Sequence, residues 1–67
     1  MDETTRQSIH GTAREAAALN RQDPGTGYAF AVGTVYAMLA DGTCPAEEKV
    51  ARALLFLVDF RRARREE

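Results

Sequence analysis

Apolar residues recur at helical spacing along the whole chain, and no window alternates between apolar and polar residues as a half-buried strand does. Helix-breaking residues gather in two places, at residues 23–27 (Asp-Pro-Gly-Thr-Gly) and at residues 41–45 (Asp-Gly-Thr-Cys-Pro). The pattern predicts one all-α domain over residues 1–67, with three helices at about residues 5–21, 26–40 and 45–65. We expect the second and third helices to form an antiparallel hairpin, with the first helix packed across it.

The predicted first helix has a narrow apolar face. Its only large apolar residues are Ile9 and Leu19, and Gly11 lowers helix stability by about 1 kcal/mol relative to alanine. Thr4 and Gln7 have the spacing of a capping box, in which each side chain binds the backbone N–H of the other residue. We therefore expect this helix to begin near residue 5 and to depend on packing against the other two. The rest of its apolar face is alanine (Ala13, Ala16, Ala17).

The predicted second helix, residues 26–40, contains no charged residue. A helix that is apolar on all sides is either enclosed by protein or placed in a membrane. Fifteen residues rise only about 22 Å, which is short of the roughly 30 Å hydrocarbon core of a bilayer, so we expect enclosure by protein. The helix also carries small residues at intervals of four, which allow another helix to approach closely. These small residues are Ala29, Gly33 and Ala37, followed by Ala40.

The predicted third helix begins at Pro45, a residue that suits the first helical position. Glu47 and Glu48 follow in the first turn, where negative charge complements the helix dipole. Glu48 and Arg52 have the spacing and order of a favourable i,i+4 ion pair. The apolar run 53–58 is wider than a single helix face, so this helix also has more apolar surface than one neighbour can cover.

The surplus apolar surface of the second and third helices predicts a homodimer. A chain of 67 residues encloses little core, and natural chains of this size are usually supported by disulfides, a metal or a partner. Cys44 is the only cysteine and His10 the only histidine, which excludes an internal disulfide and a soft-ligand zinc site. Self-association therefore remains as the way to stabilise the fold, and we expect a dimer with a two-fold axis. The predicted interface consists of Tyr28, Val32, Val35, Tyr36, Leu39, Leu54, Leu57 and Val58.

Charge is distributed unevenly along the chain, although the net charge is −1. Residues 1–48 hold three basic and seven acidic residues, whereas residues 49–67 hold six basic and three acidic residues. Four arginines end the third helix, and we expect them to bind an acidic protein partner. Nucleic acid is the alternative ligand, and a solvated helix end that complements the dipole is the plain interpretation. The four arginines are Arg61, Arg62, Arg64 and Arg65.

A helix-turn-helix arrangement of the second and third helices fits poorly. The recognition helix would be the third, and its apolar middle leaves only Lys49 and Arg52 near its start to meet DNA.

Catalytic chemistry has weak support in the sequence. Cys44 lies near a predicted helix N-terminus, which activates some thiols, but the only available base is His10 on a different helix. The glycines of residues 25–27 lack the lysine and the preceding strand of a phosphate-binding loop, so we interpret them as turn residues. We interpret Asp41 and the two glutamates of the third helix as residues that stabilise helix ends, not as a catalytic or metal-binding group. We expect no enzyme activity, no catalytic residues, no cofactor and no metal.

The acidic start Met1-Asp2-Glu3, with no apolar stretch behind it, predicts a cytoplasmic protein. Eight of the nine basic residues are arginine and twelve residues are alanine, a bias typical of a GC-rich bacterial source. Taken together, these features predict a small non-enzymatic binding or regulatory protein that acts through helix-mediated protein–protein contact.

Overall fold

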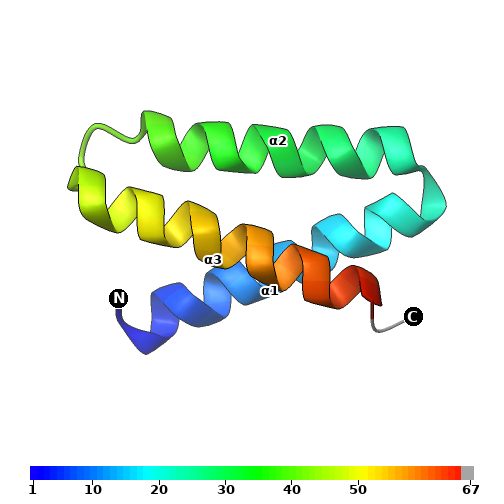
Figure 1. Cartoon of the computed structure of the whole chain (residues 1–67), viewed down its shortest axis with the longest axis horizontal. Helices are drawn as coiled ribbons and strands as arrows, with labels where there is room; N and C mark the ends of the chain where they lie inside the picture. The colour runs from blue at the N-terminus through cyan, green and yellow to red at the C-terminus, as the bar shows by residue number, and fades with distance from the viewer. Residues whose placement is uncertain (66–67) are drawn as a thin grey trace.

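A computed structural model describes residues 1–65 of the chain. It contains three helices, α1 (Glu3–Gln22), α2 (Pro24–Ala40) and α3 (Ala46–Arg65), and all three pack against one another. The predicted all-α, three-helix architecture is therefore confirmed. The molecule is a flat body with extents of 34 × 21 × 14 Å, in which α3 crosses in front of α1 in the view of Figure 1. Within residues 1–65, none of the helices combines the length and the hydropathy that crossing a bilayer requires.

Helix α1 begins two residues earlier than predicted, because Asp2 is its N-cap. The Asp2 carboxylate accepts a hydrogen bond from the backbone N–H of Thr5 at 2.7 Å, and this bond lowers the pKa of Asp2 below its ordinary value of 3.8. The predicted capping box at Thr4 is wrong. Gln7 instead donates from its side-chain amide to Glu3 at 3.2 Å, inside the first two turns.

The connection between α1 and α2 is a single residue, Asp23, which caps both helices. Its backbone N–H donates to the carbonyl of Leu19 at 2.9 Å and so ends α1. Its carboxylate accepts hydrogen bonds from the Thr26 hydroxyl at 2.7 Å and from the Gly25 N–H at 3.2 Å, which starts α2. These bonds, that from Thr26 most of all, lower the pKa of Asp23. Because Pro24 suits the first helical turn, α2 starts at residue 24 and not at 26.

Gly27 is buried where α1 and α2 approach most closely. A Cβ atom at this position would overlap the backbone of Asn20 on α1. Within residues 1–65 no glycine has a positive φ, so the interpretation of residues 25–27 as a glycine turn is wrong. The glycine at position 27 serves close helix packing instead.

Helix α3 begins at Ala46, one residue later than predicted. The Pro45 carbonyl accepts the first helical hydrogen bond, from the N–H of Lys49 at 3.0 Å. Glu47 and Glu48 lie in the first turn, as predicted. In the preceding loop, Asp41 accepts hydrogen bonds from the hydroxyl and N–H of Thr43, at 2.6 and 2.9 Å, and these lower the pKa of Asp41.

The enclosed core is small and is centred on α1 rather than on α2. Three large apolar side chains are buried, and Phe56 is fully enclosed, with 0% of its surface exposed. Its ring is stacked on that of Phe60, with centroids 6.1 Å apart. The large members are Ile9, Phe56 and Phe60, and the buried alanines are Ala13, Ala16, Ala17, Ala31, Ala53 and Ala63.

The alanine face of α1, which the sequence analysis treats as a weakness, forms the floor of this core. Small side chains let α3 approach closely, and α1 packs more extensively against α3 than α2 does. Where the C-terminal ends of α1 and α3 meet, the Arg21 guanidinium donates to the backbone carbonyl of Ala63 at 3.0 Å. That carbonyl lies in the last turn of α3, where carbonyl groups lack partners within the helix.

Candidate functional site

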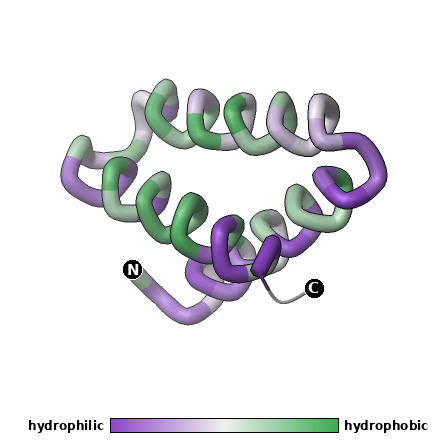
Figure 2. Tube along the Cα trace, turned by 45° about the vertical axis from the view of Figure 1, so that its right-hand side comes forward, coloured by the Kyte–Doolittle hydropathy of each residue, from purple (hydrophilic) through white to green (hydrophobic). Residues whose placement is uncertain are grey.

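Large apolar side chains are exposed along α2 and α3. Of the eight residues predicted to form an interface, seven are exposed and Val35 is half-buried. Val50, which the predicted interface does not include, is exposed as well, at 46%. Figure 2 shows hydrophobic colours along much of α2 and in the middle of α3, whereas α1 and the end of α3 are mainly hydrophilic. We call the exposed set the apolar surface: Tyr28, Val32, Tyr36, Leu39, Val50, Leu54, Leu57 and Val58.

A groove of about 200 Å³ crosses the apolar surface between α2 and α3. Tyr28, Val32 and Val35 line it from α2, with Ala31 at its base, and α3 contributes Leu57 and Phe60. No lining residue carries a charge. A hollow of this kind accepts an apolar or aromatic side chain.

The small residues of α2 are also on the outside of the molecule. Ala29, Gly33 and Ala37 are exposed, and a Cβ at Gly33 would meet no atom within 4 Å. The close helix approach that their spacing predicts is therefore not used inside the described chain. Within the chain, Gly27 is the residue that permits close approach.

The four C-terminal arginines are exposed and surround the last turns of α3. The guanidinium of Arg64 lies over the ring of Phe60, 5.4 Å from its centroid, an arrangement that favours a cation–π contact. Arg62 lines a separate polar hollow against α1. Arg61 and Arg65 are four residues apart and therefore lie on one side of the helix.

A buried carboxylate that the sequence analysis missed lies between α1 and α3. Asp59 is only 8% exposed, and its Oδ2 lies 3.5 Å from Nδ1 of His10. Together they line a hollow of about 370 Å³, to which Arg6 and Arg62 also contribute. An acidic residue between Val58 and Phe60, inside the apolar stripe of α3, was the signal that sequence reasoning passed over.

The polar hollow is lined by charged and amide side chains and by one leucine. Its other lining residues are Glu3, Gln7 and Leu55, so no hydroxyl or thiol of the described chain lines it. His10 is exposed, and its neighbour is Asp59 rather than Cys44. The structure therefore does not bring the candidate thiol and the candidate base together.

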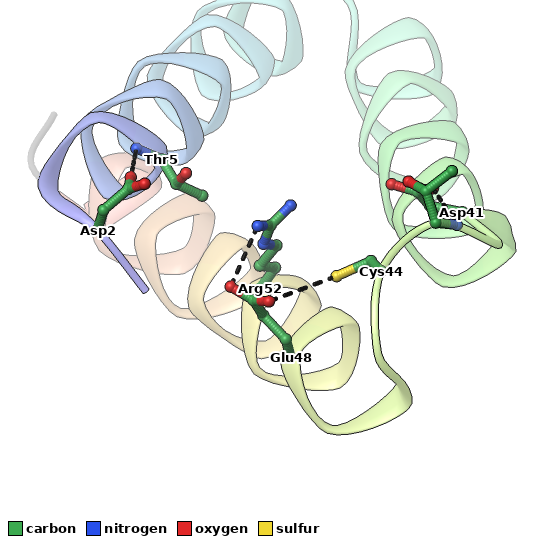
Figure 3. A network of polar contacts seen from close by, with 7 residues as sticks. Asp2, Thr5, Asp41, Cys44, Glu48 and Arg52 are labelled. Carbon is green, nitrogen blue, oxygen red and sulfur yellow. Dashed lines mark hydrogen bonds and ion pairs between the residues drawn. The ribbon is translucent and has the colours of Figure 1, made fainter.

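A second group of polar residues lies near the start of α1, in the loop before α3 and in the first turns of α3 (Figure 3). The Arg52 guanidinium donates to Glu48 at 3.1 Å, which confirms the predicted i,i+4 pair, and this bond raises the pKa of Arg52. The Cys44 thiol lies 3.9 Å from the other carboxylate oxygen of Glu48. In Figure 3 the guanidinium of Arg52 is drawn between Thr5 of α1 and Cys44 of the loop before α3.

The carboxylates of this region are each engaged locally. Asp41 binds Thr43, and Glu48 binds Arg52. Residues 1–65 contain no group of three or more His, Cys, Asp or Glu side chains placed to bind a metal ion. These bonds lie within the loop and the first turns of α3, and the apolar surface is the best-supported candidate for function.

No known protein family, no curated protein and no solved structure matches this chain.

Proposed function

We propose that this protein is a small, non-enzymatic interaction protein that forms a homodimer through α2 and α3 and presents its helical surface to a second protein in the cytoplasm. The observation that carries the proposal is that more large apolar side chains are exposed on the protein surface than are buried in its core. Within residues 1–65, three large apolar side chains are buried, whereas eight on α2 and α3 are at least 43% exposed. Contiguous apolar surface of this kind is typical of a binding surface.

A second copy of the chain is the occupant that best fits the apolar surface. A standard interface covers about 800 Å² of each partner, which is roughly a sixth of the 4567 Å² surface of this molecule. The broad face of the flat molecule, 34 by 21 Å, is of that size. In the proposed dimer, α2 and α3 of each copy form an antiparallel hairpin, and two hairpins build a four-helix bundle.

Light scattering coupled to size-exclusion chromatography tests the homodimer. At micromolar concentration we expect twice the chain mass of 7.4 kDa. Val32→Lys combined with Leu54→Lys should give a helical monomer, because both side chains are more than half exposed in the folded chain and their charge would be buried only in the dimer.

Ala18→Lys is the matched control, since Ala18 is exposed on α1 and lies outside the apolar surface. This variant should stay dimeric. A parent protein that elutes as a monomer and melts cooperatively would contradict the proposal.

The arginine end of α3 supplies the contact to the second protein. Arg61 and Arg65 point away from the core, and guanidinium groups bind carboxylates in a paired geometry. In a dimer built on α2 and α3, each copy carries one such end. The proposed partner is therefore an acidic protein segment.

Fluorescence anisotropy with a labelled glutamate-rich peptide tests this contact and separates it from nucleic-acid binding. We expect the parent to bind the peptide, and Arg61→Glu with Arg65→Glu to weaken binding at least tenfold. Lys49→Glu, in the first turn of α3 and about 18 Å along the helix from Arg61, should leave binding unchanged.

Labelled duplex and single-stranded oligonucleotides serve as the comparison in the same assay. Tighter binding to an oligonucleotide than to the peptide, with steep salt dependence, would favour the nucleic-acid alternative and refute the acidic partner.

A further inference from the structure

The outer side of α2 carries two parallel rows of residues with opposite shapes. Tyr28, Val32 and Tyr36 are spaced four residues apart and form a ridge of large side chains, 59–72% exposed. The neighbouring row, one residue further along at each step, consists of small exposed residues: Ala29, Gly33 and Ala37. Rows at four-residue spacing are the ridges and grooves by which helices pack.

We propose that α2 packs antiparallel against α2 of a second copy, with the two-fold axis between Val32 and Gly33, so that the large row of each copy meets the small row of the other. The inference rests on the proposed homodimer and specifies which helix lies at its centre. In this register, residue 28 is level with residue 37 of the other copy, residue 29 with 36, and residue 32 with 33. Every large residue is therefore opposite a small one.

Two-fold symmetry selects this orientation. A two-fold interface uses the same surface on both copies, so that surface must be complementary to itself. A ridge and a groove side by side on one helix meet that requirement when the helices run antiparallel. In a parallel pair, each residue meets its own copy, so Tyr28 faces Tyr28 and Gly33 faces Gly33. That arrangement makes large side chains collide and leaves gaps between small ones.

The partner's Tyr36 covers the small row in this arrangement, level with Ala29. At 72% exposure, Tyr36 is the most exposed of the large apolar residues in the described chain. Tyrosine is a frequent anchor in interfaces, because its ring buries a large area while its hydroxyl stays at the wet edge.

The absence of charge on α2 is consistent with a buried, central position. No residue of α2 is charged, so the contact buries no ionised group and incurs no ionic desolvation cost. Glycine and alanine at the crossing point allow the helix axes to approach to about 8 Å, the short end of the usual range. The apolar residues of α3 then flank the two central helices.

Disulfide cross-linking tests the register on a Cys44→Ser background, which removes the native thiol. A disulfide requires Cα atoms within about 7 Å. Val32→Cys, next to the axis, should cross-link to its own copy. Neither Tyr28→Cys nor Ala37→Cys should form a disulfide with its own copy. In this register the same residue in the two copies is separated by nine residues along the helix, or about 13.5 Å. Mixed under reducing conditions and then oxidised, these two variants should form a heterodimer, seen by mass spectrometry.

A parallel pair gives the opposite pattern, in which Tyr28→Cys and Ala37→Cys each cross-link to themselves. That pattern overturns the inference. The inference is also overturned if the parent protein is dimeric by light scattering but neither the Val32→Cys variant nor the mixture forms a cross-link. In that case the proposed homodimer still stands. A monomeric parent overturns both.

Gly33→Leu provides a second measurement that leaves the chain's own packing intact, because the space outside Gly33 is open. We expect its helical content by circular dichroism to match the parent and its dimer dissociation constant to rise at least tenfold. Gly11→Leu is the matched control, since Gly11 on α1 also faces open space and lies outside the proposed contact. Equal dissociation constants for Gly33→Leu and Gly11→Leu would refute the inference.

Discussion

Gly27→Ala should lower the free energy of unfolding by about 3 kcal/mol or more. The added methyl group would overlap the backbone of Asn20, and a backbone cannot move aside as a flexible side chain can. Helices α1 and α2 are joined by Asp23 alone, so they have little freedom to separate without breaking the shared cap. We expect a cost at or above the upper end of the about 1–3 kcal/mol typical of overpacking. A chain of this length has only about 3–10 kcal/mol of stability in total.

Gly11→Ala makes the comparison decisive, because it is the same substitution at a helical position with open space. It should stabilise the protein by about 1 kcal/mol through helix propensity. Urea unfolding followed by circular dichroism measures both variants. The protein concentration must be equal in all samples, since the stability of a dimer depends on it. If both substitutions raise stability, the close packing of α1 and α2 at Gly27 is wrong.

Phe56→Ala should cost about 3–5 kcal/mol, the second large effect. Among residues 1–65, Phe56 is the only large side chain with no exposed surface, and its ring is stacked on that of Phe60. The opposing surface of α1 is alanine, whose side chains are too short to move into the space left by the ring. The cavity therefore stays open, and the loss adds a cavity term to the lost burial.

Arg61→Ala is the control for Phe56→Ala, because it is exposed on the same helix and should change stability by less than about 0.5 kcal/mol. Thermal and urea unfolding of both variants measure the difference. A Phe56→Ala variant within 1 kcal/mol of the parent would mean that the core is not centred on this ring.

The apolar surface is the part of the candidate site that sequence reasoning located best. Seven of its eight exposed members follow from helical spacing and from the absence of charge on the second helix. Val50, one turn before Leu54 on α3, was not included in the predicted interface. Whether this surface binds a second copy is a prediction that the proposed experiments decide.

The polar contacts were predicted less well. The Glu48–Arg52 pair followed from i,i+4 spacing, since both residues lie on one helix. The His10–Asp59 contact joins residues on different helices, and nothing in local spacing links positions so far apart in the chain. The contact of Arg21 with the Ala63 carbonyl could not be predicted from the sequence for the same reason.

The sequence by itself determined three helices, their approximate bounds and an excess of apolar surface on the second and third. These properties are local: they depend on breakers, caps and periodicity within a few turns. Only the tertiary structure decided that the alanine face of α1 is the floor of the core, that Gly27 is a contact glycine and that Asp59 is buried beside His10. Each of these depends on which side chains from distant segments share the same space, and helix packing sets that.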